Sequence, residues 1–449
     1  MTTSAAIEID EALDPFAMAN LADPYRYYTR LRGIGPVLFL PSRNVYLATT
    51  YEAVDAALRG FRTFSSAQGA FYPRASTVRP FGRRQFELIR WAYQRYPDAT
   101  GKVLSAVMGR FGSGLLDRDP YPMTTPFIDA DPPRHTNNRR AVQPFFSKQA
   151  IEEATPMIRG HVSDLVELAL AEPDIDAVQA FSIELPSRVV ADFTGIRAPQ
   201  QHVFDWAEAI FDMGGAEPTR ATRQHAAQAY AWLLGSATRD LPEGCLSRQI
   251  IESGCAHGAG GALSATADRI LGLGAIWSAA LDTTTSLISN MLNAFADHGD
   301  QWERLRANPE LAESAVEEAM RFDSPVRIFF RTATAATVLC GVSIPAESRV
   351  GVIFAAANRD PAKFPQPDSF DIGRTPNPHL AFGASVHLCL GAPLARLEAK
   401  LLLQELARRV RLIERTDAGE RTGNALTHGF RTLPLRLIEA SKALASRTP

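Results

Sequence analysis

Cysteine is scarce in this chain, and its four cysteines are far apart: Cys245, Cys255, Cys340 and Cys389. No two of them have the C-x-x-C spacing of a zinc or redox site, and no group of His residues accompanies them. A disulfide framework is therefore not predicted, and we expect a reducing compartment, the cytoplasm.

Long hydrophobic runs are also absent. The longest, Ile270 to Leu281, has about 12 residues and lies between Arg269 and Asp282, whereas a membrane-spanning helix needs roughly 20. The first residues, Met1 to Ala12, are polar and acidic and lack the features of a secretory signal. We therefore expect a soluble protein without a membrane partner, in which the run forms a buried core helix.

An excess of charge of either sign is missing as well. The 449 residues include 47 basic and 49 acidic side chains, which give a formal net charge of −2. Nucleic acid is therefore not expected as a partner. No Gly/Ser-rich linker, Pro-rich spacer or internal repeat divides the sequence, so we expect a single domain over residues 1–449, and a monomer.

Helical periodicity dominates what is present. The pattern predicts helices at residues 24–31, 52–66, 267–294 and 310–322, with further helices between 147 and 240. Short strands are predicted as a hairpin, 37–40 with 45–48, and at 338–344, 349–354 and 433–438. The expected fold class is mainly α, with small β-sheets packed at the side.

The residues around Cys389 carry a chemical signal. Two Gly residues and an aromatic surround Cys389, and Leu394, Leu397 and Leu401 then fall on one helical face. The sulfur therefore lies at the entrance to a helix, where backbone N–H groups and the helix dipole stabilise a thiolate. A thiolate is a ligand for haem iron. The alternative from these residues alone is a buried structural cysteine in a Gly-rich turn.

This segment resembles the haem-binding signature of the cytochrome P450 family, F-G-x-G-x-H-x-C-x-G. The matching residues are Phe382, Gly383, His387, Cys389 and Gly391. Ser385 stands where the family usually has its second Gly, and a Ser would be strained there if the loop needs a positive φ. The resemblance implies haem b as the cofactor, Cys389 as the axial ligand of its iron, and the family's helical prism as the fold.

A second resemblance concerns Glu318, Arg321 and Arg374. Glu318-Ala-Met-Arg321 looks like the family's E-x-x-R, whose i, i+3 spacing places both side chains on one helix face. The resemblance implies that Arg374, from the segment before the Cys loop, completes a buried Glu–Arg–Arg network with a structural role.

A third resemblance lies in the apolar helix, which Asp282 and Thr283 interrupt. Burying such a pair is unfavourable unless it has partners or a task. In the family this place supplies protons for dioxygen reduction, which implies that Asp282 is a catalytic relay and that Thr283 holds the hydrogen-bond network. Ala280 occupies a position often held by Gly. The alternative is a Thr bonded to its own helix and an Asp at a solvent-exposed turn.

A fourth resemblance, to D-P-P-x-H-x-x-x-R, begins at Asp131. Its His135 and Arg139 stand at i and i+4, on one helix face. The resemblance implies that these two, with Arg331 and His387, bind the haem propionates through charge-assisted hydrogen bonds. It also implies a largely apolar substrate pocket, lined by Ile276, Ala279, Val326, Ile328, Phe329 and Phe430.

The segment 67–130 is longer than the family's usual connection, and we expect it to be an enlarged substrate lid. Residues 71–110 contain eight basic side chains, two acidic ones and seven aromatics. Three interpretations stay open: an extra amphipathic helix pair with a solvated basic face, a lid whose Arg residues bind an anionic substrate, and docking of an acidic carrier domain or electron donor. The near-neutral chain disfavours single-stranded nucleic acid.

The implied activity is monooxygenation of a small organic molecule, by hydroxylation or demethylation. The chain has no flavin or nicotinamide fingerprint. Electrons from NAD(P)H must therefore arrive through separate proteins, a ferredoxin and a ferredoxin reductase, with docking near Arg140 and Arg396. Two alternatives stay open: a peroxide-driven peroxygenase, against which Asp282 and Thr283 argue, and a non-catalytic haem-thiolate sensor.

Overall fold

The computed structural model describes residues 4–17, 20–21, 24–70, 127–212, 219–237, 241–248 and 261–440. The basic and aromatic residues 71–110 lie outside these ranges, so the three interpretations of that segment are untested. Within the described ranges, no helix is both long enough and apolar enough to cross a membrane.

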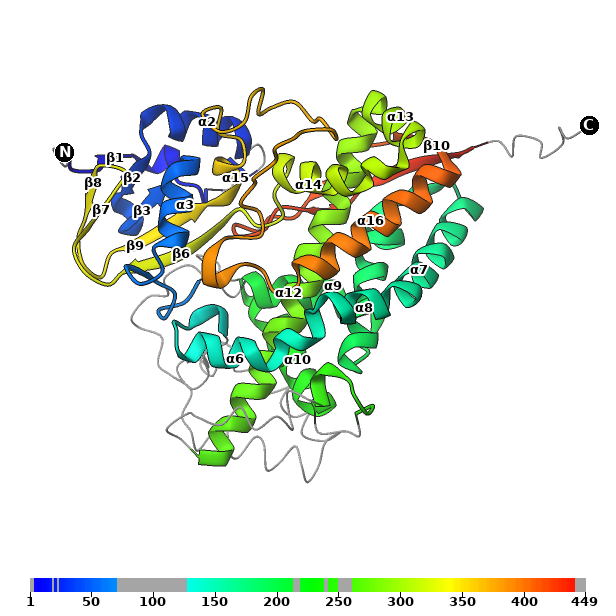
Figure 1. The fold of residues 1–449 in the computed structure, drawn as a ribbon, viewed down its shortest axis with the longest axis horizontal. Coiled ribbons are helices and arrows are strands. Elements are labelled where there is room, and N and C mark those ends of the chain that lie inside the picture. The colour runs from blue at the N-terminus through cyan, green and yellow to red at the C-terminus, as the bar shows by residue number, and fades with distance from the viewer. Residues whose placement is uncertain are drawn as a thin grey trace, which may run out of the picture.

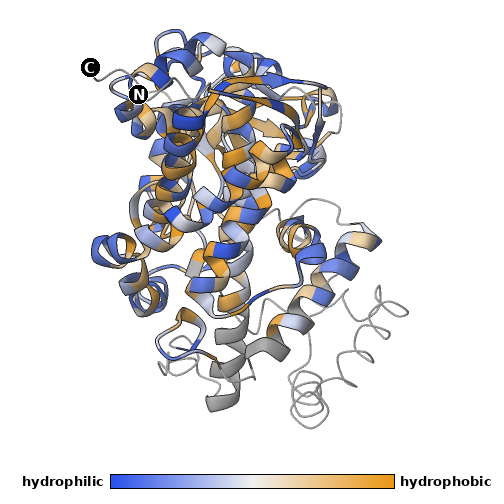
Figure 2. Ribbon diagram, turned by 90° about the vertical axis from the view of Figure 1, so that its right-hand side faces the viewer, coloured by the Kyte–Doolittle hydropathy of each residue, from blue (hydrophilic) through white to orange (hydrophobic). Residues whose placement is uncertain are grey.

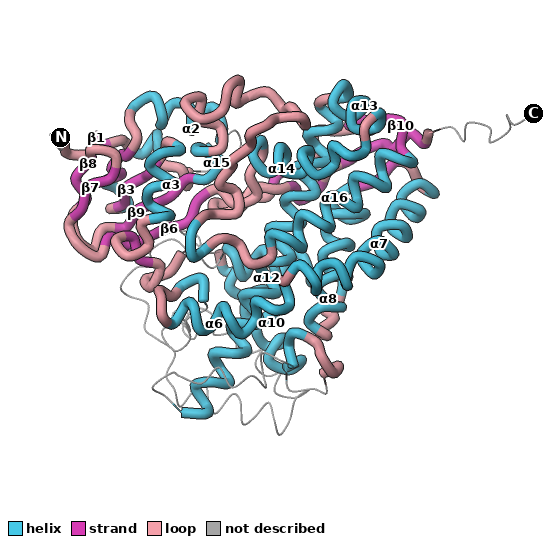
Figure 3. Tube along the Cα trace, in the orientation of Figure 1, coloured by secondary structure: helices cyan, strands magenta, loops and turns pink. Residues whose placement is uncertain are grey.

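Helices form most of the described chain (Figures 1 and 3). The larger helical body contains α6 (Arg134–Val142), α7 (Lys148–Ala171), α8 (Glu184–Thr194), α9 (Gln200–Asp212), α10 (Arg220–Ala237), α12 (Gly261–Asp297), α13 (Gly299–Ala307), α14 (Ala312–Phe322) and α16 (Ala392–Arg409). The smaller helices α2 (Pro24–Ile34), α3 (Tyr51–Arg59) and α15 (Phe354–Ala357) accompany the N-terminal sheet. The prediction of a mainly α fold is confirmed.

The main sheet has six strands in the order β1-β2-β3-β9-β6-β4. Its strands are β1 (Ile7–Glu8), β2 (Val37–Leu40), β3 (Val45–Ala48), β9 (Arg349–Ile353), β6 (Ile328–Ala333) and β4 (Phe64–Ser65). The predicted hairpin is confirmed, because β2 pairs antiparallel with β3 over the expected residues. Antiparallel pairing of β6 with β9 sets Arg331 opposite Val350 and so fixes the direction of the Arg331 side chain.

Three smaller sheets complete the β structure of the described chain. One joins β10 (Val410–Arg415), β13 (Pro434–Glu439) and β5 (Asp174–Asp176), and the other two are the pairs β11 (Glu420–Arg421) with β12 (Phe430–Thr432) and β7 (Thr337–Leu339) with β8 (Val342–Ile344). The strand expected at 338–344 is therefore a hairpin. Cys340 and Gly341 both have positive φ, 48° and 83°, and they reverse the chain there.

Helix α12 runs through the middle of the molecule, and its position explains its composition (Figure 1). An apolar helix whose every side meets protein must be hydrophobic all round. Trp277, Ile288 and Phe295 are all at most 1% exposed and belong to the largest core cluster, to which α7, α14 and α16 also contribute. Figure 2 shows the hydrophobic residues gathered toward the inside of this body. Full burial of each such side chain contributes about 1.5–3 kcal/mol.

Two element boundaries differ from the sequence expectation. The helix expected at 52–66 ends at Arg59, because Gly60 leaves the helical conformation and Phe64 and Ser65 join the sheet as β4. The apolar helix is longer than expected and extends from Gly261 to Asp297. In both cases tertiary contacts override the local pattern.

Candidate active site

A mostly apolar cavity lies between α12 and the loop that precedes α16. From α12 it is lined by Ala275, Ile276, Ala279, Ala280, Thr283, Thr284 and Leu287. The opposite wall is the segment 381–391, which includes Cys389, and β6 contributes Phe329 and Arg331. The structure thus brings Cys389, Thr283 and three of the expected propionate ligands, Arg139, Arg331 and His387, to one cavity.

Cys389 is held by the start of α16. Its backbone N–H donates to the Phe382 carbonyl at 2.9 Å, and the backbone N–H groups of Gly391 and Ala392 donate toward its sulfur. The side chain is exposed only in the sense that it lines the cavity, since protein surrounds the residue. Burial raises the pKa of the Cys389 thiol, while these two N–H groups and Arg139 oppose that rise. They are the groups that would favour the thiolate.

The loop before Cys389 contains two residues with positive φ. Gly383 has φ +70° and Ser385 has φ +61°, so both lie in the left-handed region. The expectation that a Ser at this position would be strained is therefore borne out by the backbone. The strain amounts to about 1–2 kcal/mol for a residue with a Cβ atom.

Four nitrogen-bearing side chains gather at one side of the cavity: His135, Arg139, Arg331 and His387. The rings of His135 and His387 are 4.4 Å apart between centroids. Burial lowers the pKa of His387 to about 3, and positive charge from Arg331, His135 and Arg139 adds to the effect. A buried His387 Nε2 has no hydrogen-bond partner in the described chain. The group combines two guanidinium groups with two imidazole rings.

Two carboxylates lie near this group. Asp129 and Asp131 both act electrostatically on Arg331. However, Asp131 accepts hydrogen bonds from Ser65 and Ser66, and Asp129 accepts one from the backbone of Ala70. A cofactor with two carboxylates beside a thiolate-bound metal fits this donor set, and haem b is such a group.

Thr283 and Asp282 point in different directions. The Thr283 side chain lines the cavity, and its hydroxyl donates to the Ala279 carbonyl at 2.7 Å, which is the bond to its own helix that the alternative foresaw. Asp282 is 4% exposed and is absent from the cavity wall. It is therefore not at a solvent-exposed turn. Burial, together with the charges of Glu208 and Asp212, raises the pKa of Asp282 to about 8.

Glu398 is a cavity residue that sequence reasoning missed. It lies on α16, lines the cavity, and has a buried Oε2 without a hydrogen-bond partner in the described chain. Burial raises its pKa to about 8. A signal was present, because Glu398 stands four residues after Leu394 and three before Leu401, on the face expected to be apolar.

The expected pocket residues divide into two groups. Ile276, Ala279, Val326 and Phe329 line the cavity. Ile328 does not, because side chains alternate along β6 and Ile328 packs with Phe330 on the other side. Phe430 packs instead into the main core, with the Arg421 guanidinium 3.7 Å from its ring centroid. Phe211, Ile128 and Leu287 line the cavity and were not anticipated.

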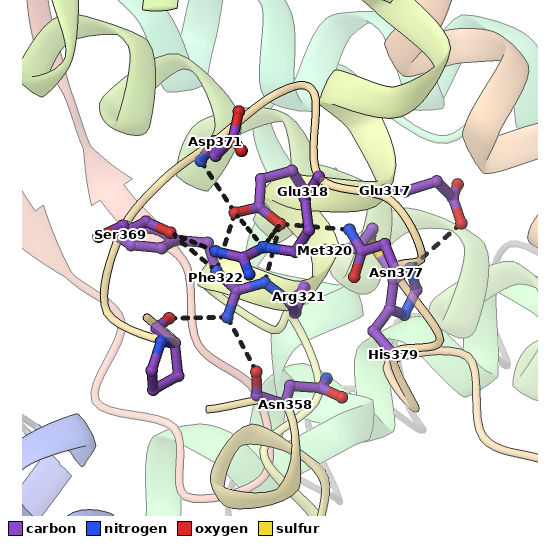
Figure 4. Close-up of polar contacts among 12 residues, drawn as sticks. Glu317, Glu318, Met320, Arg321, Phe322, Asn358, Ser369, Asp371, Asn377 and His379 are labelled. Carbon is purple, nitrogen blue, oxygen red and sulfur yellow. Dashed lines mark hydrogen bonds and ion pairs between the residues drawn. The ribbon is translucent and has the colours of Figure 1, made fainter. Parts of the chain in front are cut away.

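The Glu318, Arg321 and Arg374 side chains form one buried network behind the Cys loop. Glu318 and Arg321 have fully buried side chains and share two hydrogen bonds of 2.8 Å, and Arg374 Nε lies 3.1 Å from Glu318. Figure 4 shows Arg321 bonded also to the backbone at Ser369 and Asn358. The network fastens the segment before the Cys loop to α14.

The two Arg residues expected at a docking surface differ in their surroundings. Arg140 is exposed. Arg396 makes two hydrogen bonds to Glu317, of 2.7 and 2.8 Å, and lies over the Phe382 ring. Arg396 is therefore already paired with an acid, which weakens its expected attraction for an acidic partner.

Comparison with known proteins leads to the cytochrome P450 family. The model of that family matches residues 281–430. Cytochrome P450 CYP199A2 of Rhodopseudomonas palustris is 30% identical over 437 residues, which cover 95% of this chain and 94% of that protein. The cytochrome P450 monooxygenase PikC of Streptomyces venezuelae is 33% identical over 318 residues, 69% of this chain and 75% of that protein. The structure of cytochrome P450 CYP109Q5 from Chondromyces apiculatus is 27% identical, with a TM-score of 0.73 over 97% of this chain and 99% of that one.

Proposed function

The chain belongs to the cytochrome P450 family of monooxygenases, and on that premise we propose that Cys389 is the axial ligand of haem b and that the enzyme oxidises an apolar small molecule. One oxygen atom enters the substrate and the other leaves as water. The observation that carries this proposal is the cavity itself, which has Cys389 on one wall, Thr283 on the other, and the side chains of His135, Arg139, Arg331 and His387 gathered at one side.

His135, Arg139, Arg331 and His387 would hold the two propionates. Such binding would pair two carboxylates with two guanidinium groups and two imidazole rings through charge-assisted hydrogen bonds. When bound, the haem supplies the redox chemistry, and thiolate ligation favours cleavage of the O–O bond. Gly391 and Ala392 would stabilise negative charge on the Cys389 sulfur through their backbone N–H groups.

The protons would come from this chain's own carboxyl groups. A carboxyl with a pKa near the working pH both holds and releases a proton, which suits general acid chemistry. The pKa values of Asp282 and Glu398, each about 8, meet this condition. The Thr283 hydroxyl, whose hydrogen is engaged by Ala279, presents oxygen lone pairs to the cavity and is able to orient a water there.

The substrate should be apolar where it meets the described wall. Ile276, Val326, Phe211 and Phe329 line this part of the cavity, and the charged lining residues of the described chain are Arg139 and Arg331, which we assign to the propionates, and Glu398 of α16. An ionised group placed against this wall would lose its hydration without a partner. The segment 67–130, which we propose as a lid, would supply the remaining wall.

Electrons should come from NAD(P)H through a ferredoxin and a ferredoxin reductase. The exposed Arg140 lies on α6, the helix that also carries the expected propionate ligands His135 and Arg139. A positively charged surface near the cofactor would attract an acidic electron donor and raise its rate of association. Hydroxylation or demethylation of a carbon centre is the expected outcome.

The carbon monoxide difference spectrum of the reduced, purified protein tests the proposal. We expect a strongly red-shifted Soret band in the wild type and in the control Cys340→Ser, and its loss in Cys389→Ser. A haem spectrum that does not depend on Cys389 would overturn the assignment. A thiolate spectrum with turnover by peroxide alone would favour a peroxygenase, and one without any turnover would favour a sensor.

A further inference from the structure

Asp282 belongs to a group of carboxyls behind the cavity wall. Helix α9 packs against α12, and Glu208 and Asp212, one helical turn apart on α9, both act electrostatically on Asp282. Glu208 is 8% exposed and Asp282 is 4% exposed. The Asp282 Oδ2 is buried and has no hydrogen-bond partner in the described chain. A polar atom at this depth is unfavourable unless it exchanges a proton or binds water.

The group has fewer cations than acids. Arg431, next to Phe430 on β12, donates to Glu208 and lies 3.5 Å from Asp205. His225 of α10 also faces Glu208, and the Thr427 side chain faces Asp282. Arg431 acts on Glu208 and Asp212, and both of these acids act on the buried Asp282. Ionisation of all three carboxyls together is therefore unfavourable near neutral pH, which favours a proton kept within the group.

The position of that shared proton follows from the partners. Glu208 has the direct bond to Arg431, so it is the member most able to carry negative charge, although burial raises its pKa. Burial raises the pKa of Asp212 to about 7, with Glu208 adding to the rise and Arg431 opposing it. Asp282, with a pKa of about 8, lies deepest. The proton is thus held between α9 and α12.

The group connects the outside of the molecule to the cavity. Arg431 and Asp205, at its outer end, have side chains that are 40% and 41% exposed. At its inner end Asp282 is followed in the chain by Thr283, which lines the cavity. The structure therefore offers a run of acidic groups from the surface to the residue beside the cavity.

We propose that Glu208 and Asp212 are positioning residues that deliver protons from solvent to Asp282. The inference rests on the function proposed above, in which Asp282 supplies protons to the cavity. In each transfer one O–H bond breaks and one forms, either between two carboxyls or between a carboxyl and water. A proton that leaves Asp282 toward the cavity is replaced from Asp212 or Glu208, and they are reprotonated from solvent near Arg431. No group is oxidised or reduced.

The charge state of the group is tested first, without turnover. Infrared titration of the purified holoprotein should show a protonated carboxyl band that is absent from Asp282→Asn and disappears as the pH rises through about 7–8. In Asp212→Asn a negative charge facing Asp282 is gone, so the band should disappear at lower pH. The matched control is Asp205→Asn, which also removes an acid beside Arg431 but should leave the band unchanged.

The transfer role is tested by NAD(P)H-driven oxygen uptake with a surrogate ferredoxin and reductase. We expect Asp212→Asn and Glu208→Gln to slow uptake on the order of tenfold and to enlarge the solvent deuterium isotope effect, because positioned proton donors contribute about 10²–10⁴-fold and water replaces them in part. Asp205→Asn should behave as the wild type. Haem content, read from the carbon monoxide spectrum, shows that each variant is folded.

Failure of this inference differs from failure of the proposed function. An unshifted infrared band in Asp212→Asn, or unchanged uptake in both α9 variants, would overturn the path while the wild type kept its thiolate spectrum and its sensitivity to Asp282→Asn. If the wild type itself had no thiolate-bound haem, the proposed function would fail, and the path would fail with it.

Discussion

Ser385 shows how one residue stores strain beside the candidate cofactor. Its φ of +61° is in the region that Gly adopts freely and other residues adopt at a cost. The residue before it, Ala384, has an ordinary extended backbone, with φ −151° and ψ 171°. Substitution by Gly should therefore have opposite effects on stability at Ser385 and at Ala384.

Ser385→Gly should stabilise the protein. Relief of the backbone strain at Ser385 should stabilise the folded state by about 1–2 kcal/mol. The greater freedom of Gly in the unfolded chain should reduce this gain by about 0.5–1 kcal/mol. We expect a net gain of up to about 1 kcal/mol in the free energy of unfolding, measured by chemical denaturation of the holoprotein. Ala384→Gly should destabilise, since it adds freedom without relieving strain. Equal effects of the two substitutions on the free energy of unfolding would contradict backbone strain at Ser385.

Asp282 should make stability depend on pH. Its pKa in the folded protein, about 8, exceeds the ordinary Asp value of 3.8, so between these pH values the folded state binds a proton that the unfolded state has released. Stability from this group is therefore complete below about pH 4 and is lost as pH rises to about 8. Asp282→Asn should remove this dependence on pH. Relative to the wild type, the free energy of unfolding of the variant should therefore increase from about pH 4 to about pH 8, measured by denaturation at a series of pH values. A difference between the two proteins that did not change with pH would show that the pKa of Asp282 is close to its ordinary value.

At the scale of elements, the Glu318 network joins α14 to the segment before the Cys loop. Glu318 accepts hydrogen bonds from Arg321, Arg374, the backbone of Asp371 and the side chain of Asn377. Arg321 and Arg374 in turn donate to backbone carbonyls of residues 358 and 365–369. The carbonyls of an irregular segment are thus satisfied by side chains in place of secondary structure.

Glu318→Gln should destabilise the protein by about 3–5 kcal/mol, because it leaves the buried Arg321 charge without its partner. The control is Arg304→Gln. Arg304 pairs with Asp371 of the same segment at 2.7 Å, but both side chains are more than 40% exposed. An exposed pair contributes about 0–1 kcal/mol. Thermal and chemical unfolding of both variants would test this contrast, and similar losses would show that burial is not the cause.

At the scale of the whole molecule, the cavity lies where the N-terminal sheet meets the helical body. Arg331 comes from the sheet, His135 and Arg139 from α6, and Cys389 from the loop before α16. Burial lowers the pKa of His387, and the positive charges of Arg331, His135 and Arg139 lower it as well. A haem with two propionates would place negative charge among these groups and join the two regions.

Removal of haem should therefore loosen the structure unevenly. Hydrogen exchange of the haem-free protein should show lost protection in α6 and in the segment 381–391, whereas α7 and the C-terminal half of α16 should remain protected by their apolar core. Arg331→Gln should weaken haem retention, measured as the rate at which the holoprotein loses haem. Uniform loss of protection would indicate that haem supports the core and not this region in particular.

Local spacing is sufficient to predict several features of this protein. The helical class, the hairpin β2–β3, the Glu318–Arg321 pair and the placement of Cys389 before a helix all follow from neighbours within a few residues. Four short resemblances also named the family. Local periodicity is sufficient in these cases because helix and strand geometry carry it directly into space.

Only the tertiary structure decided the directions of side chains relative to the cavity. Asp282 and Thr283 are neighbours, yet successive residues on a helix point about 100° apart, and the packing of α9 against α12 assigns one to the carboxyl group and the other to the cavity. Packing in the same way directs Phe329, but not Ile328, into the cavity, and it brings Glu398 to the cavity wall. Which side of an element meets which neighbour is a property of the assembled chain, and periodicity alone does not contain it.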